Sequence, residues 1–380
     1  MRHKYKLKIF IFAIVLCTVL LLLRPIYRRT LDIKIHPTDF NKYVYCFDDT
    51  YYYLQPDGIY VFDDSNQNKI IELNNCKQFV VDSQYIYCLI TDSYKYNITI
   101  YDKNNSNKIK KIDLTDKNIN LLGISDDKLI YCHWNNDSSK KNMVFLDISD
   151  GKKIDIENDI KNYGHVSIYK NDYIKTANIY SEDLFSTQNG NKINCNDGWS
   201  STVIGFINNT IIYTCNMDFI AEIILLDTEN NIENSIHIAY DSKLCGAESL
   251  LFNINEEQNK FVLAGNKASP FFLEAYIDSS DELKYHKYDV VAVFDSTHCS
   301  LINEKTFRTF ERVICVDKDK VMTYYKGHYL TYDLNNWKVI RKQDADEIKN
   351  GGSYTFETCG DYIFVFDDDS GELLNTININ

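Results

Sequence analysis

A short phrase recurs along this chain and limits what it can fold into. In residues 58–73 (GIYVFDDSNQNKIIEL) an apolar and aromatic stretch ends in aspartate, and a polar turn leads into a stretch in which polar and apolar residues alternate. Alternation with a period of two is typical of half-buried β-strands. Aspartate followed by Asn or Gly is typical of tight turns, because these residues hydrogen-bond to their own backbone or tolerate positive φ. The phrase therefore predicts a β-hairpin.

The chain holds eight versions of this phrase. The other copies lie at residues 97–114, 143–156, 184–195, 222–238, 273–286, 328–340 and 362–377. The residue that opens each turn, called here the marker, is in chain order Asp63, Asp102, Asp147, Gln188, Asp227, Asp278, Asp333 and Asp367. These markers are 34 to 55 residues apart, and the longest interval, between Asp278 and Asp333, predicts an irregular insertion at residues 288–312. Such a period, with two further apolar strands before most hairpins, is typical of a β-propeller with one four-stranded blade per repeat.

We therefore predict an all-β fold, a β-propeller of seven or eight four-stranded blades. The last unit is short, which leaves the blade number open. With this repeat pattern the chain resembles the broad group of β-propeller repeat proteins, which includes WD40-like, quinoprotein-like and TolB-like propellers. The resemblance implies a ring closed by a strand from the opposite terminus, for which residues 31–35 (LDIKI) are the candidate. It is architectural, since the GH…WD signature of true WD40 repeats is absent, and it assigns no functional residues.

The first thirty residues differ in kind from the repeats. Residues 9–23 (IFIFAIVLCTVLLLL) carry no charge and have basic residues on both sides. No small-residue cleavage site follows them, which favours an uncleaved signal-anchor over a cleaved signal peptide or a buried core helix. More basic residues precede the segment than follow it, which predicts a cytoplasmic N-terminus. We predict a cytosolic tail and transmembrane signal-anchor helix in residues 1–30, and an extracytoplasmic propeller at the cell membrane in residues 31–380.

The charge of the chain narrows the class of partner. Its net charge is −13, and because the first thirty residues hold seven Lys or Arg and no acid, residues 31–380 carry a net charge of −20. An acidic domain disfavours nucleic acid and anionic lipid surfaces as partners. It is compatible with cationic partners, and also with a simple solvated acidic surface. We predict no nucleic-acid partner.

Eleven cysteines and many aspartates raise the question of metals and disulfides. The cysteines are widely spaced and no HExxH is present, so no zinc site is predicted. Asp367, Asp369 and Gly371 resemble a calcium loop, but Gly371 stands where the loop needs an oxygen ligand, and a hairpin turn is favoured. No cofactor is predicted. Strand cysteines such as Cys88 and Cys132 are interpreted as small buried hydrophobes, and disulfide pairing in an exported domain stays open.

The candidate binding residues come from propeller topology. Loops that join strand two to strand three, and loops that join blades, share one face. Five aromatic or imidazole side chains are predicted on that face near the mouth of the central channel: His133, Trp134, Trp199, Tyr94 and Tyr96. Exposed aromatics on one face are a common basis for recognising a protein or a glycan. The alternative is that these rings fill the contacts between blades.

These observations favour a membrane-anchored, extracytoplasmic β-propeller that binds or scaffolds a protein or glycan partner. The alternative is a propeller-type hydrolase or lyase with its site at the channel mouth. No nucleophile elbow, phosphate-binding loop or dinucleotide fingerprint occurs in the chain, and the catalytic residues stay unknown. The sequence therefore favours a binding protein over an enzyme without identifying its ligand.

Overall fold

The computed structural model describes the chain in separate stretches. These are residues 33–38, 43–63, 66–92, 95–116, 118–125, 128–134, 141–156, 165–169, 173–177, 182–186, 192–193, 202–207, 210–214, 220, 222–227, 230, 232–245, 248–268, 275–277, 283–285, 287–308, 310–349 and 351–380. The predicted membrane segment at residues 9–23 lies outside them.

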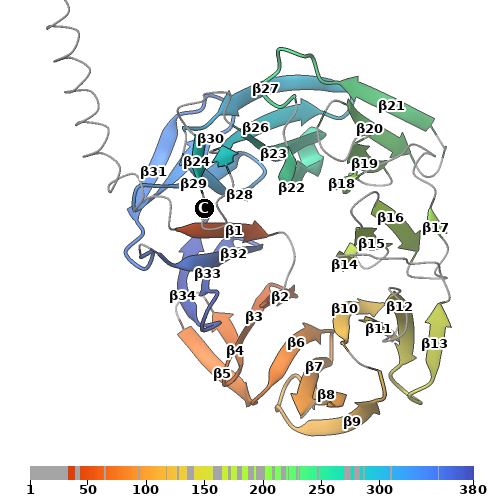
Figure 1. Ribbon diagram of the computed structural model, residues 1–380. Helices are drawn as coiled ribbons and strands as arrows, with labels where there is room; N and C mark the ends of the chain where they lie inside the picture. Colours follow the sequence, from red (N-terminus) through yellow and green to blue (C-terminus); the bar gives the residue numbers. More distant parts are fainter. Residues whose placement is uncertain are drawn as a thin grey trace, which may run out of the picture.

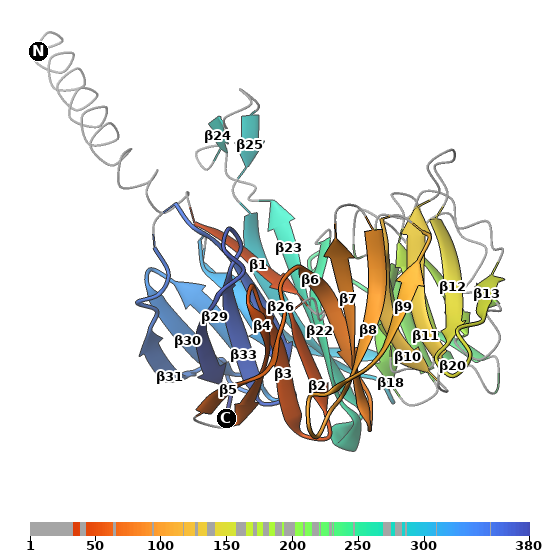
Figure 2. The ribbon, with the colours of Figure 1, turned by 90° about the horizontal axis from the view of Figure 1, so that it is seen from below.

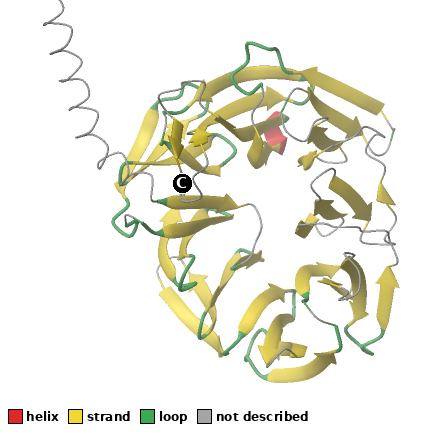
Figure 3. Cartoon of the chain, viewed as in Figure 1, coloured by secondary structure: helices red, strands yellow, loops and turns green. Residues whose placement is uncertain are grey.

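Eight four-stranded sheets, counted over the described residues, stand around a central axis (Figure 1). Six are formed by four consecutive strands, a seventh is interrupted by an inserted pair of strands, and the eighth combines the two ends of the described chain. Almost all regular structure drawn in Figure 3 is strand. The chain is therefore a β-propeller, as predicted, and the sheets are called blades 1 to 8 in chain order.

The strands of the first four blades follow one another without interruption. Blade 1 holds β2 (Val44–Phe47), β3 (Thr50–Gln55), β4 (Gly58–Asp63) and β5 (Asn66–Glu72); blade 2 holds β6 (Cys76–Val81), β7 (Tyr85–Asp92), β8 (Lys95–Asp102) and β9 (Lys108–Leu114); blade 3 holds β10 (Asn120–Ser125), β11 (Lys128–Trp134), β12 (Lys141–Asp147) and β13 (Lys153–Ile156); blade 4 holds β14 (His165–Tyr169), β15 (Tyr173–Ala177), β16 (Glu182–Ser186) and β17 (Lys192–Ile193).

The later blades include one insertion and one strand from the N-terminal side. Blade 5 holds β18 (Thr202–Ile207), β19 (Thr210–Thr214), β20 (Glu222–Asp227) and β21 (Ile232–His237); blade 6 holds β22 (Glu248–Asn255), the 3₁₀ turn η1 (Glu256–Gln258), β23 (Lys260–Ala268), β26 (Lys287–Asp295) and β27 (Ser300–Thr306); blade 7 holds β28 (Arg312–Val316), β29 (Lys320–Tyr325), β30 (His328–Asp333) and β31 (Val339–Asp344); blade 8 holds β1 (Lys34–Thr38), β32 (Ser353–Cys359), β33 (Tyr362–Asp367) and β34 (Leu373–Asn378). The small sheet of β24 (Ala275–Ile277) and β25 (Leu283–Tyr285) lies between β23 and β26.

The two faces of the propeller carry different connections. The turn face carries the connections from first to second and from third to fourth strand, for example at Asp48–Asp49 and after Asp333. The loop face carries the second-to-third connections and those between blades. The β24–β25 hairpin projects from the loop face (Figure 2). Strand β1 also begins on this face, because it runs parallel to β32, a first strand that enters from an inter-blade connection.

The marker aspartates close the hairpins as predicted. The Oδ1 atom of Asp102 accepts the backbone N–H of Asn104 at 2.9 Å, and that of Asp367 accepts the N–H of Ser370 at 2.8 Å. Gly371 follows at φ 72°, a left-handed conformation that glycine adopts without strain. These hydrogen bonds hold the pKa of Asp367 below its ordinary value. The FDDDSGEL segment is therefore a hairpin turn, in agreement with the sequence.

The assignment of blade 6 from sequence was wrong in one respect. Residues 273–286 were predicted to form its outer hairpin, and residues 288–312 an irregular insertion. In the structure β26 and β27 form the outer hairpin, while the insertion contains β24 and β25. The marker of this blade is Asp295, whose Oδ1 accepts the N–H groups of Thr297 and His298, both at 2.9 Å. Asp278 lies outside the described residues.

The hydrophobic core lies between blades and is divided into separate clusters. One cluster joins blades 2 and 3 and contains Tyr87, Tyr96 and Tyr131; another joins blades 5 and 6 and contains Ile212, Leu225 and Phe261. Further clusters join blades 1 and 2, 6 and 7, 7 and 8, and 8 and 1. In the part of the chain whose side chains are described, neighbouring blades therefore bury their faces against each other, which is how a propeller exceeds the usual size of a single core.

The ring closes where blade 8 meets blade 1. Strand β1 overlaps the predicted closing segment at Lys34 and Ile35 and pairs with β32 in parallel, Ile35 opposite Tyr354. The contact between the two blades is largely aromatic. The ring centroids of Tyr43 and Phe366 are 4.9 Å apart, and further aromatic pairs are Tyr51–Tyr362 at 5.2 Å, Phe62–Tyr362 at 5.0 Å and Phe62–Phe364 at 5.6 Å. A strand from the opposite terminus therefore joins the last blade, as predicted.

A lysine inside an aromatic cluster links blades 6 and 7. The ammonium of Lys305 lies 4.2 Å from the ring centroid of Tyr332, 5.3 Å from that of Phe307 and 5.7 Å from that of Trp337. It also donates to the Trp337 carbonyl at 3.3 Å. Trp337 lies in the third-to-fourth turn of blade 7. The cation faces three π systems, an arrangement that attracts it electrostatically.

We expect Lys305→Met to lower the free energy of unfolding by about 1–2 kcal/mol, because it removes a cation–π contact at a partly desolvated site while keeping the aliphatic length. Guanidinium unfolding of the full chain measures the change. Lys342→Met, at an exposed lysine of β31, is the matched control and should stay within about 0.5 kcal/mol of the parent protein. Equal effects of the two substitutions would show that the aromatic cluster gains nothing from the charge.

Candidate functional site

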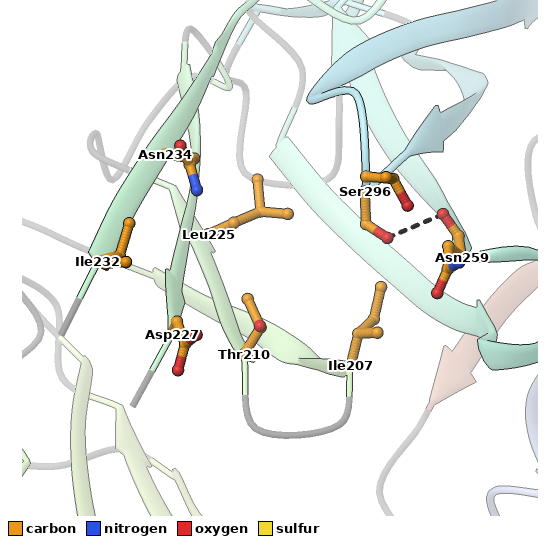
Figure 4. A pocket seen from close by; sticks show the side chains of 9 residues that line it. Ile207, Thr210, Leu225, Asp227, Ile232, Asn234, Asn259 and Ser296 are labelled. Atoms are coloured by element: carbon orange, nitrogen blue, oxygen red, sulfur yellow. Dashed lines mark hydrogen bonds between the residues drawn. The ribbon is translucent and has the colours of Figure 1, made fainter. Parts of the chain in front are cut away.

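A cleft of about 300 Å³ opens between blades 5 and 6 on the turn face (Figure 4). Most of its lining residues lie in or next to turns between strands, and Leu225 and Asn234 are a strand pair just inside one turn: Ile207, Thr210, Leu225, Asp227, Ile232, Asn234, Asn259, Ser296 and Thr297. The side chains from blade 5 face those from blade 6 across the gap (Figure 4). The volume is at the lower end of the range for sites that hold small ligands or a short segment of a larger one.

Turn hydrogen bonds fix the polar walls of the cleft. On blade 6, the backbone N–H and the hydroxyl of Ser296 both donate to the Asn259 carbonyl, at 2.9 and 2.8 Å, which ties two turns together. On blade 5, Asp227 accepts the N–H and the side-chain amide of Asn230, at 3.1 and 2.8 Å. The positions of Asp227 and Ser296 are therefore set by local turn chemistry, which makes the walls preorganised.

The floor of the cleft is apolar and belongs to the inter-blade core. Ile207 and Leu225 are each only 4% exposed and are part of the cluster between blades 5 and 6. Ile232, which also lines the cleft, is 54% exposed. An apolar floor with hydroxyl, amide and carboxylate groups above it can hold a ligand with both a hydrocarbon part and hydrogen-bonding groups. Asp227 is the single ionisable residue among the lining residues, and its charge favours a neutral or cationic ligand.

The structure places His133 in a polar cluster on blade 3. Its Nε2 atom is 4.0 Å from Oδ1 of Asp116, in the connection from blade 2 to blade 3. The other oxygen of Asp116 accepts the hydroxyl of Tyr131 at 2.8 Å and the ammonium of Lys153 at 2.6 Å. Burial opposes ionisation of this carboxyl, but the hydrogen bonds from Lys153 and Tyr131 hold its pKa below the ordinary value. Asp116 was not anticipated, because its role depends on an inter-blade connection meeting strands β11 and β13.

The other predicted binding residues are not brought together on an exposed patch of the described chain. Trp134 is the last residue of β11, opposite Lys141 in β12. Tyr96 is 8% exposed, packs in the cluster between blades 2 and 3, and has the Lys77 ammonium 5.2 Å from its ring centroid. Tyr94 and Trp199 lie outside the described residues. Binding by these five side chains stays a prediction.

The sequence analysis missed the residues of the cleft. Asp227 had been identified as a turn marker, and the segment that holds Ser296 and Thr297 had been taken as an insertion. Turns with polar residues occur in every blade, so composition does not distinguish this pair of turns. The signal that separates them is spatial: the third-to-fourth turn of blade 5 faces both turns of blade 6 across a hollow.

Two further findings concern the described residues. Within those stretches no group of three or more His, Cys, Asp or Glu is placed to hold a metal ion. In the same part of the chain, no helix has the length and hydropathy needed to cross a membrane.

Comparison with known proteins supports the fold. No protein-family model and no curated protein matches the chain. The structure of apo AztD from Citrobacter koseri is similar, with a TM-score of 0.50 and 12% identity, over 80% of this chain and 86% of that chain. BamB from Moraxella catarrhalis is similar over 89% of this chain and 94% of its own, with 9% identity and a TM-score of 0.49. Hsv2p from Kluyveromyces lactis gives a TM-score of 0.47 and 10% identity, over 78% of this chain and 95% of that chain.

At such low identity the likeness concerns architecture alone. Together with the eight sheets, it places the chain among the β-propeller proteins.

Proposed function

We propose that this protein is a membrane-anchored, extracytoplasmic β-propeller that works as a binding module, with its ligand site in the cleft between blades 5 and 6. The cleft is the observation that carries the proposal, because it combines an apolar floor with fixed polar walls. The anchor rests on the uncharged residues 9–23 and their basic flanks.

The chemistry of the cleft suggests the class of ligand. Thr210, Ser296 and Thr297 bring hydroxyls, Asn234 and Asn259 bring amides, and none of the described lining residues is basic. Amides and hydroxyls both donate and accept, so they suit the peptide groups of an extended segment. The carboxylate of Asp227 and the net charge of −13 favour a segment that carries Lys or Arg. We propose a short cationic peptide segment of a partner protein as the ligand.

The position of β1 suggests how the propeller is oriented. Ten residues, 24–33, separate the apolar segment from β1, and ten residues reach at most about 36 Å. Because β1 begins on the loop face, an anchor at residues 9–23 would hold that face toward the membrane. The turn face, with the cleft, would then point away from the membrane and be open to soluble partners.

Site-specific photo-crosslinking in intact cells tests the proposal. A benzophenone amino acid replaces Thr297 in the cleft, and the matched control replaces Asn335, which follows the marker of blade 7 as Thr297 follows that of blade 6. We expect a discrete adduct from position 297 and none from position 335. Asn234→Trp, which fills the cleft, should remove the adduct because the segment can no longer enter.

Competition with a peptide of known charge tests whether the adduct at position 297 comes from a cationic segment. A lysine-rich decapeptide added outside the cells should reduce the adduct at position 297, whereas a glutamate-rich decapeptide should not. The full chain should also stay with the membrane fraction after alkaline carbonate washing. Equal adducts from both positions, or an adduct that survives Asn234→Trp, would refute the cleft as the site. Release of the full chain by carbonate would refute the anchor independently.

A further inference from the structure

Two first strands lie side by side where the ring closes. Strand β2 of blade 1 and strand β32 of blade 8 run in the same direction, and Glu357 of β32 reaches across the gap. Its Oε2 atom accepts the backbone N–H of Val44 in β2 at 2.9 Å. This hydrogen bond fixes the register of the two strands, because it sets Glu357 beside Val44.

Two residues further along each strand stand Cys46 and Cys359. Side chains alternate along a strand, so Cys359 points to the same side as Glu357, toward β2. Both cysteines pack in the aromatic cluster between blades 8 and 1, together with Tyr51 and Phe364. The two side chains are close enough in this cluster for each to shift the pKa of the other. Both are free thiols in the structure.

We propose that Cys46 and Cys359 are a disulfide site that locks the propeller ring covalently when a disulfide donor oxidises them. The two residues are separated by the same 313 positions as Val44 and Glu357. A bond between them would therefore enclose nearly the whole propeller in one covalent loop. Among the described cysteines, Cys46 is the only one in blade 1 and Cys359 is the only one in blade 8.

The two thiols have unequal environments, which suggests the order of the chemistry. Cys46 is partly exposed, and its interaction with Cys359 lowers the pKa of its thiol. Cys359 is 6% exposed; the interaction with Cys46 and its own burial both raise the pKa of its thiol. Cys46 is therefore the accessible group that ionises first, and Cys359 is the sheltered group that resolves the intermediate.

The reaction balances with oxidised glutathione as the donor. The Cys46 thiolate attacks one sulfur of the donor, and a mixed disulfide forms while one glutathione thiolate leaves. The Cys359 thiolate then attacks the Cys46 sulfur, the Cys46–Cys359 bond forms, and the second glutathione thiolate leaves. The two protons lost by the cysteine thiols are taken up by the two glutathiones, so the protein dithiol is oxidised by two electrons and the donor is reduced by two.

A second pair of cysteines offers an internal comparison. Cys76 and Cys88 also interact, but they belong to adjacent strands of blade 2, and Cys88 is fully buried. A bond between them would close only a short loop inside one blade, so it would constrain the unfolded chain much less. Cys132 and Cys315 are each buried in a blade and serve as controls for nonspecific oxidation.

The test uses the full chain, purified reduced in detergent, with Cys76 and Cys88 replaced by alanine. The protein is incubated with oxidised glutathione, blocked with N-ethylmaleimide and digested without reduction for mass spectrometry. We expect one linked peptide pair, Cys46 with Cys359, and a midpoint of thermal unfolding raised by roughly 5 °C relative to the reduced protein. Dithiothreitol should reverse both changes.

Variants in which one cysteine is replaced distinguish the Cys46–Cys359 bond from general effects of oxidation. Cys46→Ser should fold, because the side chain is partly exposed, and should lose both the linked peptide and the shift in midpoint. Cys315→Ala should keep both. Glutathione retained on Cys46 with Cys359 still free, or linked peptides spread over several cysteine pairs, would overturn the proposal. The outcome does not depend on the cleft or on the membrane anchor.

Discussion

Replacing Glu357 with alanine is expected to lower the free energy of unfolding by about 3–5 kcal/mol. Glu357 is fully buried in β32, and its carboxylate accepts the backbone N–H of Tyr43 at 3.1 and 2.9 Å and that of Val44 at 2.9 Å. Alanine leaves both N–H groups without this partner at the contact between the last blade and the first. Each buried donor left unpaired costs about 1–3 kcal/mol, and bonds to a charged group are at the upper end.

Guanidinium unfolding of the full chain measures this loss. Glu357→Gln keeps one amide oxygen of the same reach, so we expect it to lose about half as much as alanine. Glu372→Ala, at an exposed acid of the same blade, is the matched control and should change stability by less than about 0.5 kcal/mol. If Glu357→Ala behaved like Glu372→Ala, the aromatic cluster alone would hold the ring closed.

The propeller fold could be predicted because the sequence signals that specify its strands and turns are local. The alternating strands and the marker aspartates recur in one short phrase, and each aspartate acts on the two or three residues that follow it. Asp102 and Asp147 show this directly, since each accepts backbone N–H groups from its own turn. Such signals survive divergence between repeats because they do not depend on contacts with distant residues.

The wrong assignment of the outer hairpin in blade 6 shows what local sequence signals cannot decide. Asp278 and Asp295 both follow an apolar stretch and precede turn residues, so the phrase fits either position. What separates them is the pairing of β23 with β26, in which Gly265 lies opposite Val290. This pairing crosses the inserted β24–β25 hairpin. The sequence therefore predicted the presence of an extra segment but placed it on the wrong side of the marker.

The candidate site was harder to predict from the sequence than the fold. Tyr96 was predicted at an exposed face, but it is buried because the side of β8 that carries it packs against blade 3. The cleft arises from turns of two blades that face each other, and neither turn is unusual alone. Strand patterns predict which residues alternate, but the packing between neighbouring blades decides which of them remain exposed.

Replacing Arg312 with alanine is the second large effect that we expect, at about 3–5 kcal/mol near pH 7. Asp289 in β26 is fully buried, and the Arg312 guanidinium lies 2.9 Å from its Oδ1 atom. Asn266 donates to the same oxygen at 2.7 Å, and the Val313 N–H donates to Oδ2 at 2.6 Å. Without Arg312 the carboxylate would keep these two neutral donors but lose its cation, which leaves an uncompensated buried charge between blades 6 and 7.

The loss should depend on pH in a defined direction. Burial raises the pKa of Asp289, Arg312 opposes the rise, and the nearby buried Glu311 adds to it. A carboxyl with a raised folded-state pKa favours the fold fully below its unfolded pKa, and this contribution is lost as pH rises through the folded pKa. Removing Arg312 raises the folded pKa further and moves the loss to higher pH. The deficit of Arg312→Ala should therefore be smaller at pH 5 than at pH 7.

A double-mutant cycle makes this prediction specific. Asp289→Asn removes the charge but keeps an acceptor for Val313, so Asp289→Asn with Arg312→Ala should recover much of the stability that Arg312→Ala loses. Arg341→Ala is the matched control, because Arg341 donates to the neutral carbonyl of Asn378 at 2.9 Å. It should cost about 1 kcal/mol at both pH values. A pH-independent loss for Arg312→Ala, unchanged by Asp289→Asn, would mean that Arg312 stabilises the contact between the blades by packing and not by its charge.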